Sequence, residues 1–300
     1  MLIVRALGGL GNQLYQYALS EALMARGKEV KLDVSAYFPG GRERENRRLE
    51  LSMFPFLTYE EASLREIDRF LDRSRFPLSR LRRGLLGSRA RVYEEPTGFS
   101  EEVFEKEDMY LEGFWQNEAY FRDILPALRE KLTFPWQGLY YANEYYRDRM
   151  LKENSVGLHI RRTDYIDESH SFRYGGICTP EYYHAALEAC GEAECYYLFT
   201  DDQAWVLTHV HDFIPENAKY VLCDWNHGEN SFYDLLLMAS CRAMICANSS
   251  FSCWGARLGT RADKLMIRPL QMDNTLDIPA ETQHREWEGW LLIDREGKLR

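Results

Sequence analysis

Short apolar runs alternate along this chain with segments whose apolar residues recur at helical spacing, and this alternation limits the possible folds more than any other feature. Residues 2–6 form a strand-like run, a glycine-rich turn follows, and apolar residues then recur at helical spacing up to Gly27. A second strand-like run covers residues 30–34. A strand, a helix and a strand in this order normally pack as a parallel unit. We therefore expect a parallel sheet in the first part of the chain.

The same alternation returns after residue 150. Before residue 150, a further strand is expected at 109–111 and a further helix at 118–132. Two later helix starts carry capping signals, Thr179 before Pro180 and Ser231 three residues before Asp234. The later strand-like runs cover residues 156–160, 196–200, 220–223, 243–247 and 264–268.

The break between the two alternating halves falls near residues 140–152. It predicts an α/β protein with two Rossmann-like domains facing a cleft, covering residues 1–150 and 151–300. Ligands of such sheets bind at the carboxyl ends of the strands. We therefore expect the functional residues among those that follow each predicted strand.

Charge and cysteine usage narrow the class of protein. The net charge of −10 disfavours a nucleic-acid binder, which needs a positive face. The seven cysteines form no C-x-x-C pair and lie mostly in apolar runs, so we expect reduced core residues in a reducing compartment. The first residues are too short an apolar run for a signal peptide, and no run approaches the length of a membrane span. These features favour a cytoplasmic location.

The glycine-rich turn nearly matches the dinucleotide-binding pattern G-x-G-x-x-G. It contains Gly9 and Gly11, and Asp33 follows about twenty residues later, which would suit an NAD-dependent oxidoreductase. Leu14 replaces the third glycine, however, and polar Asn12 opens the helix. A helix start of this kind can also hold an anion, and a tight structural turn is the third interpretation.

A dense group of charged residues follows the predicted strand 156–160. It comprises His159, Arg161, Arg162 and Asp164. Adjacent side chains of a strand point to opposite faces, so one arginine can face a ligand and the other the structure. Guanidinium binds phosphate in a bidentate manner, which makes Arg161 the candidate for a departing diphosphate. Asp164 can orient an arginine or accept a proton, and a surface ion pair is the alternative.

Two further strand ends carry polar groups. Asp201 and Asp202 can bind Mg²⁺, a base or ribose, or cap the next helix. Ser249 and Ser250 precede a helix of small residues, where hydroxyl and N–H groups can cradle phosphate. Asp234 can close a capping box, or accept the adjacent N–H groups of guanine.

Together these segments resemble the α-1,2-fucosyltransferase family, which uses GDP-fucose and inverts the anomeric carbon. The resemblance implies a GT-B-like fold whose C-terminal domain holds GDP and whose N-terminal domain holds the acceptor. It also implies a reaction without a metal or other cofactor, which argues against the Mg²⁺ interpretation of Asp201 and Asp202. The similar blocks are 9–18 (GLGNQLYQYA), 112–121 (EGFWQNEAYF), 159–165 (HIRRTDY), 199–202 (FTDD) and 232–254.

The resemblance assigns roles to the polar strand ends. Arg161 would hold the β-phosphate, Asp234 would recognise guanine, and Ser249 and Ser250 would contact phosphate. The donor-binding residues expected on this basis are Gly9, Gly11, Asn12, His159, Arg161, Asp201, Asp234, Ser249 and Ser250.

The function expected from this resemblance is transfer of L-fucose from GDP-fucose to a galactoside hydroxyl in α-1,2 linkage. The acceptor would be a galactose-containing oligosaccharide or lipid-linked glycan of a bacterial surface polysaccharide or lipopolysaccharide. Arg161 would act on the leaving group and Asp164 would be the base, with Asp167 or Glu168 as substitutes. The alternatives are a GDP-sugar transferase of other sugar or linkage specificity and a non-catalytic glycan-binding protein.

Residues 73–91 are unusually basic for an acidic chain. Seven arginines alternate there with Phe76, Leu78, Leu81, Leu85 and Leu86. Such a segment can touch anionic lipid, which would place the protein at the inner face of the cytoplasmic membrane. The alternative is a solvated face whose leucines are buried in the domain.

Overall fold

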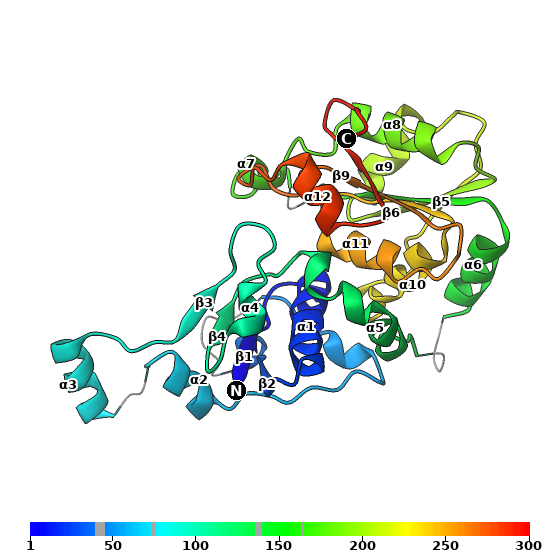
Figure 1. The fold of residues 1–300 in the computed structure, drawn as a ribbon. Coiled ribbons are helices and arrows are strands. Elements are labelled where there is room, and N and C mark those ends of the chain that lie inside the picture. The colour runs from blue at the N-terminus through cyan, green and yellow to red at the C-terminus, as the bar shows by residue number, and fades with distance from the viewer. Residues whose placement is uncertain (40–45, 74–75, 136–139, 164) are drawn as a thin grey trace. The chain divides into compact units, whose positions relative to one another are not determined.

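The computed structural model describes residues 1–39, 46–73, 76–135, 140–163 and 165–300 (Figure 1). It divides into two compact units, Met1–Thr133 and Phe134–Arg300. Each unit is built on a parallel sheet with helices packed against it. The predicted α/β class, with one Rossmann-like sheet in each half of the chain, is confirmed.

Unit 1 contains the first βαβ unit as the sequence predicts. Strand β1 (Leu2–Arg5) pairs in parallel with β2 (Val30–Asp33) on one side and with β4 (Tyr110–Glu112) on the other. Strand β3 (Val92–Glu94) completes the order β2-β1-β4-β3. The helices are α1 (Leu10–Ala25), α2 (Leu64–Phe70), α3 (Pro77–Leu86), α4 (Glu102–Glu105) and α5 (Leu125–Lys131).

One predicted helix of unit 1 is wrong in its extent. The segment 118–132 is not continuous: two 3₁₀ turns, Glu118–Tyr120 and Arg122–Ile124, precede α5. Pro126 lies in the first turn of α5. Proline has no N–H to donate inside a helix, so it marks a helix start and not an interior position.

Unit 2 has a longer sheet in the order β10-β9-β8-β5-β6-β7. The five predicted strands are all present, with ends shifted by one or two residues. The sixth strand, β10, was not predicted. The strands are β5 (Ser155–Ile160), β6 (Cys195–Thr200), β7 (Tyr220–Leu222), β8 (Ala243–Ile245), β9 (Leu265–Pro269) and β10 (Trp290–Ile293).

The order of these strands creates a topological switch point. The chain runs outward from β5 through β6 to β7, then returns to the other side of β5 for β8, β9 and β10. The connections therefore leave β5 and β8 in opposite directions at their carboxyl ends, which opens a crevice suited to a ligand. Every residue of β5 is buried, as expected for the centre of a parallel sheet covered on both faces.

The helices of unit 2 cover this sheet. Thr179 caps α8 by accepting a hydrogen bond from the Tyr182 main-chain N–H at 3.1 Å, as its sequence signal predicts. Six of the seven cysteines are buried and all seven are free thiols, which confirms them as core residues. The helices are α6 (Tyr141–Lys152), α7 (Ser171–Tyr174), α8 (Pro180–Cys190), α9 (Gln203–His209), α10 (Tyr233–Ser240), α11 (Ser250–Arg257) and α12 (Ala280–Glu286).

The division between the units lies earlier than residue 150. Contacts place α6 in unit 2, where it packs against α10, and the division falls after Thr133. The C-terminal residues also belong to unit 2. Arg268 of β9 is fully buried, with its guanidinium 4.0 Å from the centre of the Trp287 ring and a hydrogen bond of 2.7 Å to Gln283. In the described residues, no helix is long and apolar enough to cross a membrane.

Lys264 fixes the C-terminal end of α10. Its ammonium donates to the main-chain carbonyls of Met238 and Cys241, each at 2.7 Å, and to that of Ala239 at 3.3 Å. Carbonyls at the end of a helix lack partners within the helix, and a cation there also complements the helix dipole. Burial lowers the pKa of the Lys264 ammonium to about 8.

We predict that Lys264→Met lowers the free energy of unfolding by about 2–3 kcal/mol, because buried carbonyl oxygens lose their donor. Urea unfolding of unliganded protein measures the change. Lys298→Met is the matched control, since the Lys298 residue is exposed, and it should stay within about 0.5 kcal/mol. Equal stability of the two variants would show that Lys264 does not hold this helix end.

Candidate functional site

The carboxyl ends of β5, β6 and β8 bring the predicted polar residues of unit 2 together. Asp201 organises the segment that follows β5. Its carboxylate accepts hydrogen bonds from the Arg162 main-chain N–H at 2.9 Å and from the Thr163 hydroxyl at 2.6 Å. The same carboxylate lies 3.1 Å from Nε of Arg161. Asp201 therefore holds Arg161 in position.

The neighbouring arginine has a structural role. Asp202 caps α9 by accepting a hydrogen bond from the Trp205 main-chain N–H at 3.1 Å. Nε of Arg162 lies 3.3 Å from the Asp202 carboxylate, and its guanidinium lies 3.7 Å from the centre of the Trp205 ring. Of the two adjacent arginines, Arg162 thus packs onto α9, in agreement with the expected division between them.

Tyr165 connects the segments that follow β5 and β8. Its ring centre is 5.8 Å from the Arg161 guanidinium carbon, and its hydroxyl donates to the Asn248 carbonyl at 2.8 Å. Tyr165 also stacks on Tyr174, with ring centres 5.2 Å apart. Tyr165 therefore lies beside Arg161 with its ring and bonds to Asn248 with its hydroxyl. The sequence reasoning assigned no role to Tyr165, although it belongs to one of the quoted blocks.

The start of α11 offers donors beside Asn248. Ser249 occupies the N-cap position with extended backbone, and Ser250 is the first helical residue. The Ser249 side chain makes no capping hydrogen bond to the helix. The first N–H groups of a helix lack partners within it and carry a partial positive charge, so this helix start can bind an anion.

Asp234 belongs to a second polar cluster of unit 2, on the first turn of α10. Asn226 donates to the Asp234 carboxylate at 2.7 Å and to the Asn143 side-chain oxygen at 2.9 Å, while Asn143 donates back to Asn226 at 2.7 Å. Trp225 also donates to Asn143, at 2.7 Å. The two asparagines are buried, and they tie α6 to the segment before α10.

The predicted capping box of Ser231 and Asp234 is wrong. Helix α10 begins at Tyr233, and Phe232 is at the N-cap with no side-chain capping bond. The Asp234 side chain instead turns to Asn226. Burial raises its pKa to about 7, and the hydrogen bond from Asn226 opposes that shift. A carboxyl whose pKa is raised by burial and which has one specific polar partner is a candidate for a binding or catalytic group.

His159 and Asp164 are the other two residues predicted around the end of β5. His159 is buried within β5, and its main-chain carbonyl accepts a hydrogen bond from the Tyr183 hydroxyl at 2.9 Å. Asp164, the expected base, lies outside the described residues. Within the described part of the chain, no group of three or more His, Cys, Asp or Glu side chains is arranged to hold a metal ion.

The glycine-rich turn of unit 1 is locked by amide side chains. Gln13 donates to the carbonyls of Gly8 and Arg48, at 2.9 and 2.7 Å, and accepts from the Glu50 main-chain N–H at 2.8 Å. Gly8 has a positive φ of 81°, and a Cβ there would lie 2.5 Å from the Asn12 side chain. The turn therefore requires glycine at position 8.

The residues named for donor binding lie just after this position. Gly9 is the N-cap of α1, and a Cβ added to it would meet no atom within 4 Å, whereas Gly11 is buried in the first turn. The Asn12 side chain accepts a hydrogen bond from Gln116 at 2.7 Å. This bond joins two of the quoted blocks, which are far apart in the sequence.

Asp33 does not resemble the free acid of a dinucleotide site. Its carboxylate accepts hydrogen bonds from the buried Tyr110 hydroxyl at 2.7 Å and the Ser35 main-chain N–H at 2.9 Å. Asp33 is itself buried, and the bond from Tyr110 connects β2 to β4. A structural role for Asp33 removes the main support for the oxidoreductase interpretation.

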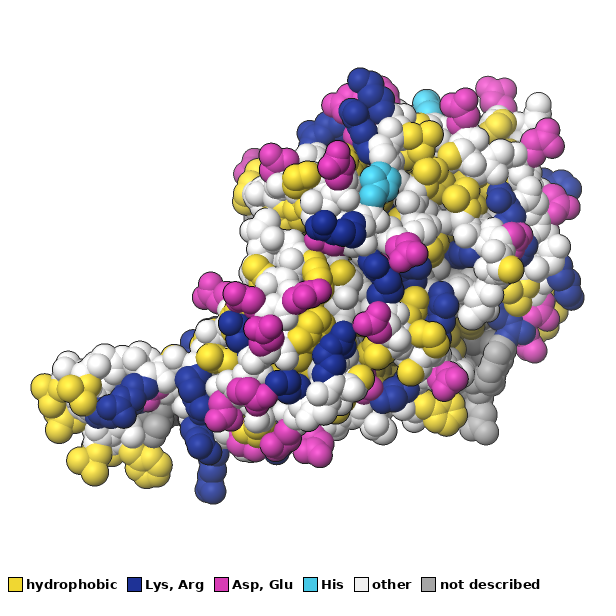
Figure 2. All heavy atoms as spheres, in the orientation of Figure 1, with side chains coloured by type: hydrophobic (Ala, Val, Ile, Leu, Met, Phe, Trp, Pro, Cys, Tyr) yellow, Lys and Arg dark blue, Asp and Glu magenta, His cyan; other side chains and the backbone are white. Residues whose placement is uncertain are grey.

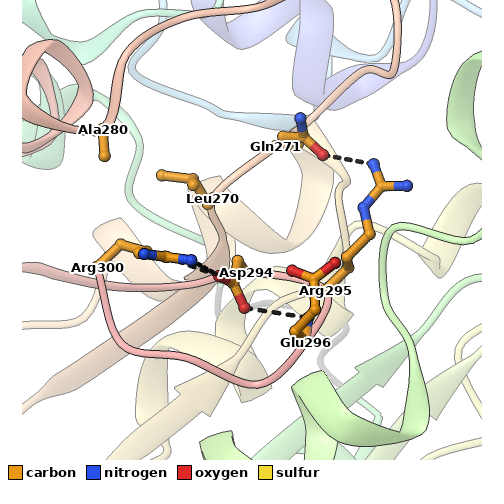
Figure 3. Close-up of a pocket in the computed structure, with 7 residues that line it drawn as sticks. All are labelled: Leu270, Gln271, Ala280, Asp294, Arg295, Glu296 and Arg300. Atoms are coloured by element: carbon orange, nitrogen blue, oxygen red, sulfur yellow. Dashed lines mark hydrogen bonds and ion pairs between the residues drawn. The ribbon is translucent and has the colours of Figure 1, made fainter.

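A separate pocket of about 370 Å³ lies at the carboxyl ends of β9 and β10 (Figure 3). Asp294 closes one side by accepting hydrogen bonds from the main-chain N–H groups of Glu296 at 3.0 Å and Lys298 at 2.8 Å, and from Nε of Arg300 at 2.7 Å. Arg295 also lines the pocket, and it donates to Gln271 and to Asn274, the latter at 2.9 Å. These bonds secure the C-terminal residues, for which the sequence predicted no structure.

Two curated relatives span most of the chain. An alpha-1,2-colitosyltransferase of Escherichia coli is 29% identical over 276 residues, which are 86% of this chain and 87% of that protein. The O-antigen biosynthesis glycosyltransferase WbnK of Escherichia coli is 27% identical over 285 residues, covering 87% of this chain and 91% of that protein.

Solved structures of fucosyltransferases are more distant. NodZ from Bradyrhizobium is 16% identical, with a TM-score of 0.43 over 86% of this chain and 91% of that chain. POFUT1 in complex with GDP-fucose is 12% identical, with a TM-score of 0.44 over 89% of this chain and 97% of that chain.

The profile of glycosyl transferase family 11 matches residues 100–291. This region is more than half of the chain and contains Arg161, Asp201, Asp234 and the start of α11. The chain therefore belongs to glycosyl transferase family 11, and it is a glycosyltransferase.

Proposed function

We propose that this glycosyltransferase transfers L-fucose from GDP-fucose to a galactoside hydroxyl in α-1,2 linkage. The observation that carries the proposal is the position of Arg161 at the switch point of unit 2. Asp201 holds it from one side, and Tyr165 links it to Asn248 and the start of α11. A guanidinium and a helix start on neighbouring strand ends suit a diphosphate.

Charge on the leaving group is the central requirement of the reaction. As the bond between the anomeric carbon and the β-phosphate oxygen breaks, negative charge collects on GDP. Arg161 remains protonated at any physiological pH, and the Ser249 and Ser250 hydroxyls and main-chain N–H groups add fixed dipoles. These groups take the part that a divalent cation plays in other nucleotide-sugar enzymes, so we propose a metal-free mechanism.

The proposed reaction is a single in-line displacement. The acceptor oxygen forms a bond to the anomeric carbon while GDP leaves from the opposite face, which inverts that carbon. The acceptor proton passes to a base, for which Asp164 is the proposed group. Asp201 acts through Arg161 and is in this scheme a positioning residue.

Asp234 is the residue proposed to recognise the guanine of the donor. Guanine presents the N1–H and the amino group as adjacent donors, and a carboxylate accepts both. Asn226 holds the Oδ1 atom of Asp234, and the carboxyl is only partly buried. Among the described residues, the Oδ2 atom has no hydrogen bond. A guanine ligand would supply the donors that this oxygen lacks.

The names of the relatives support the finer parts of the proposal. One relative is named for α-1,2 transfer and the other for O-antigen biosynthesis. The first name agrees with an α-1,2 linkage, and the second agrees with a bacterial surface polysaccharide as the product. Fucose as the sugar follows from the family resemblance, and a GDP-sugar transferase that uses another sugar is the alternative. Turnover with GDP-fucose but not with GDP-mannose or GDP-colitose would separate these possibilities.

We predict that Arg161→Ala lowers kcat by more than about 100-fold, the usual effect of removing one donor that stabilises transition-state charge. Turnover of GDP-fucose with a galactoside acceptor in the presence of EDTA measures it. Arg69→Ala, at an exposed arginine of α2, is the control and should keep full activity. Unchanged turnover by the Arg161 variant would refute its assignment.

A second prediction concerns the pH dependence of GDP binding. The Asp234 carboxylate is the form that accepts both guanine donors, so GDP affinity should rise with pH up to about 7 and then level off. Asp234→Asn should weaken GDP binding by about 10–100-fold above pH 7 and flatten this part of the profile. Calorimetry on both proteins isolates Asp234, because ionisation of the phosphates is common to both.

The raised pKa of Asp234 also predicts that the variant Asp234→Asn has a larger free energy of unfolding than wild type. The pKa of an exposed aspartate such as Asp234 in the unfolded chain is 3.8, and burial in the folded protein raises it to about 7. The unfolded state therefore binds fewer protons in this window, and the contribution of Asp234 to the free energy of unfolding falls as pH rises through it. Asp234→Asn should be more stable than wild type at pH 8, and by less at pH 5.

Urea unfolding at the two pH values tests this difference. Asp277→Asn, at an exposed aspartate of unit 2, is the matched control and should show no comparable change with pH. If Asp234→Asn proved less stable than wild type at pH 8, the Asp234 carboxylate would be a stabilising group, and its assignment to a ligand would lose its physical basis.

A further inference from the structure

Helix α3 carries a hydrophobic face that unit 1 does not cover. No residue of α3 is buried. Leu78, Leu81 and Leu85 are spaced to lie on one side of the helix and are 81%, 61% and 74% exposed. Phe76 and Leu86 at the two ends are also exposed. The alternative drawn from the sequence, in which these leucines are buried in the domain, is therefore wrong.

The same segment concentrates positive charge. Residues 73–91 contain seven arginines and no acidic residue, in a chain whose net charge is −10. Figure 2 shows hydrophobic side chains gathered over α3, with Lys and Arg side chains beside them. Exposed apolar groups on a monomer are normally scattered, and a gathered patch usually marks an interaction surface.

Some arginines of this segment lie close to the Asp72 carboxylate, and others make no ion pair in the part of the chain that the structure describes. Asp72 pairs with Arg82, lies 3.9 Å from Arg83, and accepts the main-chain N–H of Arg89 at 2.8 Å. These bonds fix the C-terminal half of α3 and the residues that follow it to one carboxylate. Within the described residues, the guanidinium groups of Arg80 and Arg89 have no ion-pair partner.

We propose that α3 and its flanking arginines bind the surface of a bilayer that contains anionic phospholipid. The leucine face would enter the boundary between headgroups and acyl chains, and Arg80 and Arg89 would contact lipid phosphates. A ten-residue helix is too short to span a bilayer, so it would lie in the plane of the surface. The charge favours lipid over a second copy of this chain, because a like-charged α3 face would repel its partner.

Membrane binding through α3 would bring the enzyme to a lipid-linked glycan, which is one of the expected acceptors and is found only at a membrane. The inference does not use the donor site, which lies in unit 2. Loss of lipid binding and loss of GDP turnover are therefore separate results.

The test uses the full chain and co-sedimentation with vesicles of phosphatidylcholine alone or mixed with phosphatidylglycerol. We expect binding only to the mixed vesicles. Raising the salt from about 0.1 M to about 1 M should release the protein, because it shortens the Debye length from about 10 Å to about 3 Å. Absence of binding to the mixed vesicles at low salt would overturn the proposal.

Two variants separate the apolar and the charged contributions. Arg80→Ser with Arg89→Ser should weaken binding by about 25-fold, since each basic residue near an anionic surface contributes roughly fivefold. Leu78→Ser, Leu81→Ser and Leu85→Ser together should abolish binding. Leu207→Ser, at an exposed leucine of α9, is the control and should bind as wild type does.

The melting temperature and the turnover of a soluble acceptor should be unchanged in all of these variants, because none of the replaced side chains is buried. If the leucine variant bound vesicles normally but lost a concentration-dependent dimer seen in the wild type, the face would be an interface between two copies. That result would refute the membrane assignment.

Discussion

The carboxylate of Asp201 is the interaction on which the candidate site depends. It gathers the Arg162 N–H, the Thr163 hydroxyl and the Arg161 guanidinium at the point where β5 ends. Arginine has many rotamers, and a single partner on the adjacent strand end removes much of that freedom before a ligand arrives. The parallel order of the sheet then places the start of α11 after β8, the strand on the other side of β5. The candidate site lies at this point because a topological switch brings together the ends of strands that are distant in sequence.

A second feature of unit 2 is that its proposed base-reading group is kept at a cost in stability. Burial raises the pKa of Asp234 to about 7, and only Asn226 compensates for the carboxylate. The surroundings are rigid nevertheless: Asn143 and Asn226 are bonded to each other at one end of α10, and Lys264 binds the carbonyls at its other end. A rigid support for a destabilised polar group is what a preorganised binding site requires.

The extent to which the sequence predicted this structure follows from the range of the interactions involved. Strands such as 156–160 and the helix start at Thr179 were predicted because apolar runs and capping residues act locally. The break at Pro126 was missed although its cause is also local. The partners of Asp201, the bond from Tyr165 to Asn248 and the Asn143–Asn226 pair join residues about 40 to 80 positions apart, so no local pattern contains them. Sequence reasoning accordingly found the polar strand ends but assigned Asp201 to the ligand, where the structure shows it holding Arg161.

In the proposed mechanism, fixed groups of unit 2, and no cation, hold the diphosphate of the donor. Calorimetric titration with GDP and with GMP in EDTA, on wild type and on Arg161→Ala, tests it most directly. We expect wild type to prefer GDP strongly over GMP without metal, because Arg161 acts on the β-phosphate, and we expect the variant to lose most of this preference. A preference for GDP that appears only when Mg²⁺ is added, or that is equal in both proteins, would contradict it.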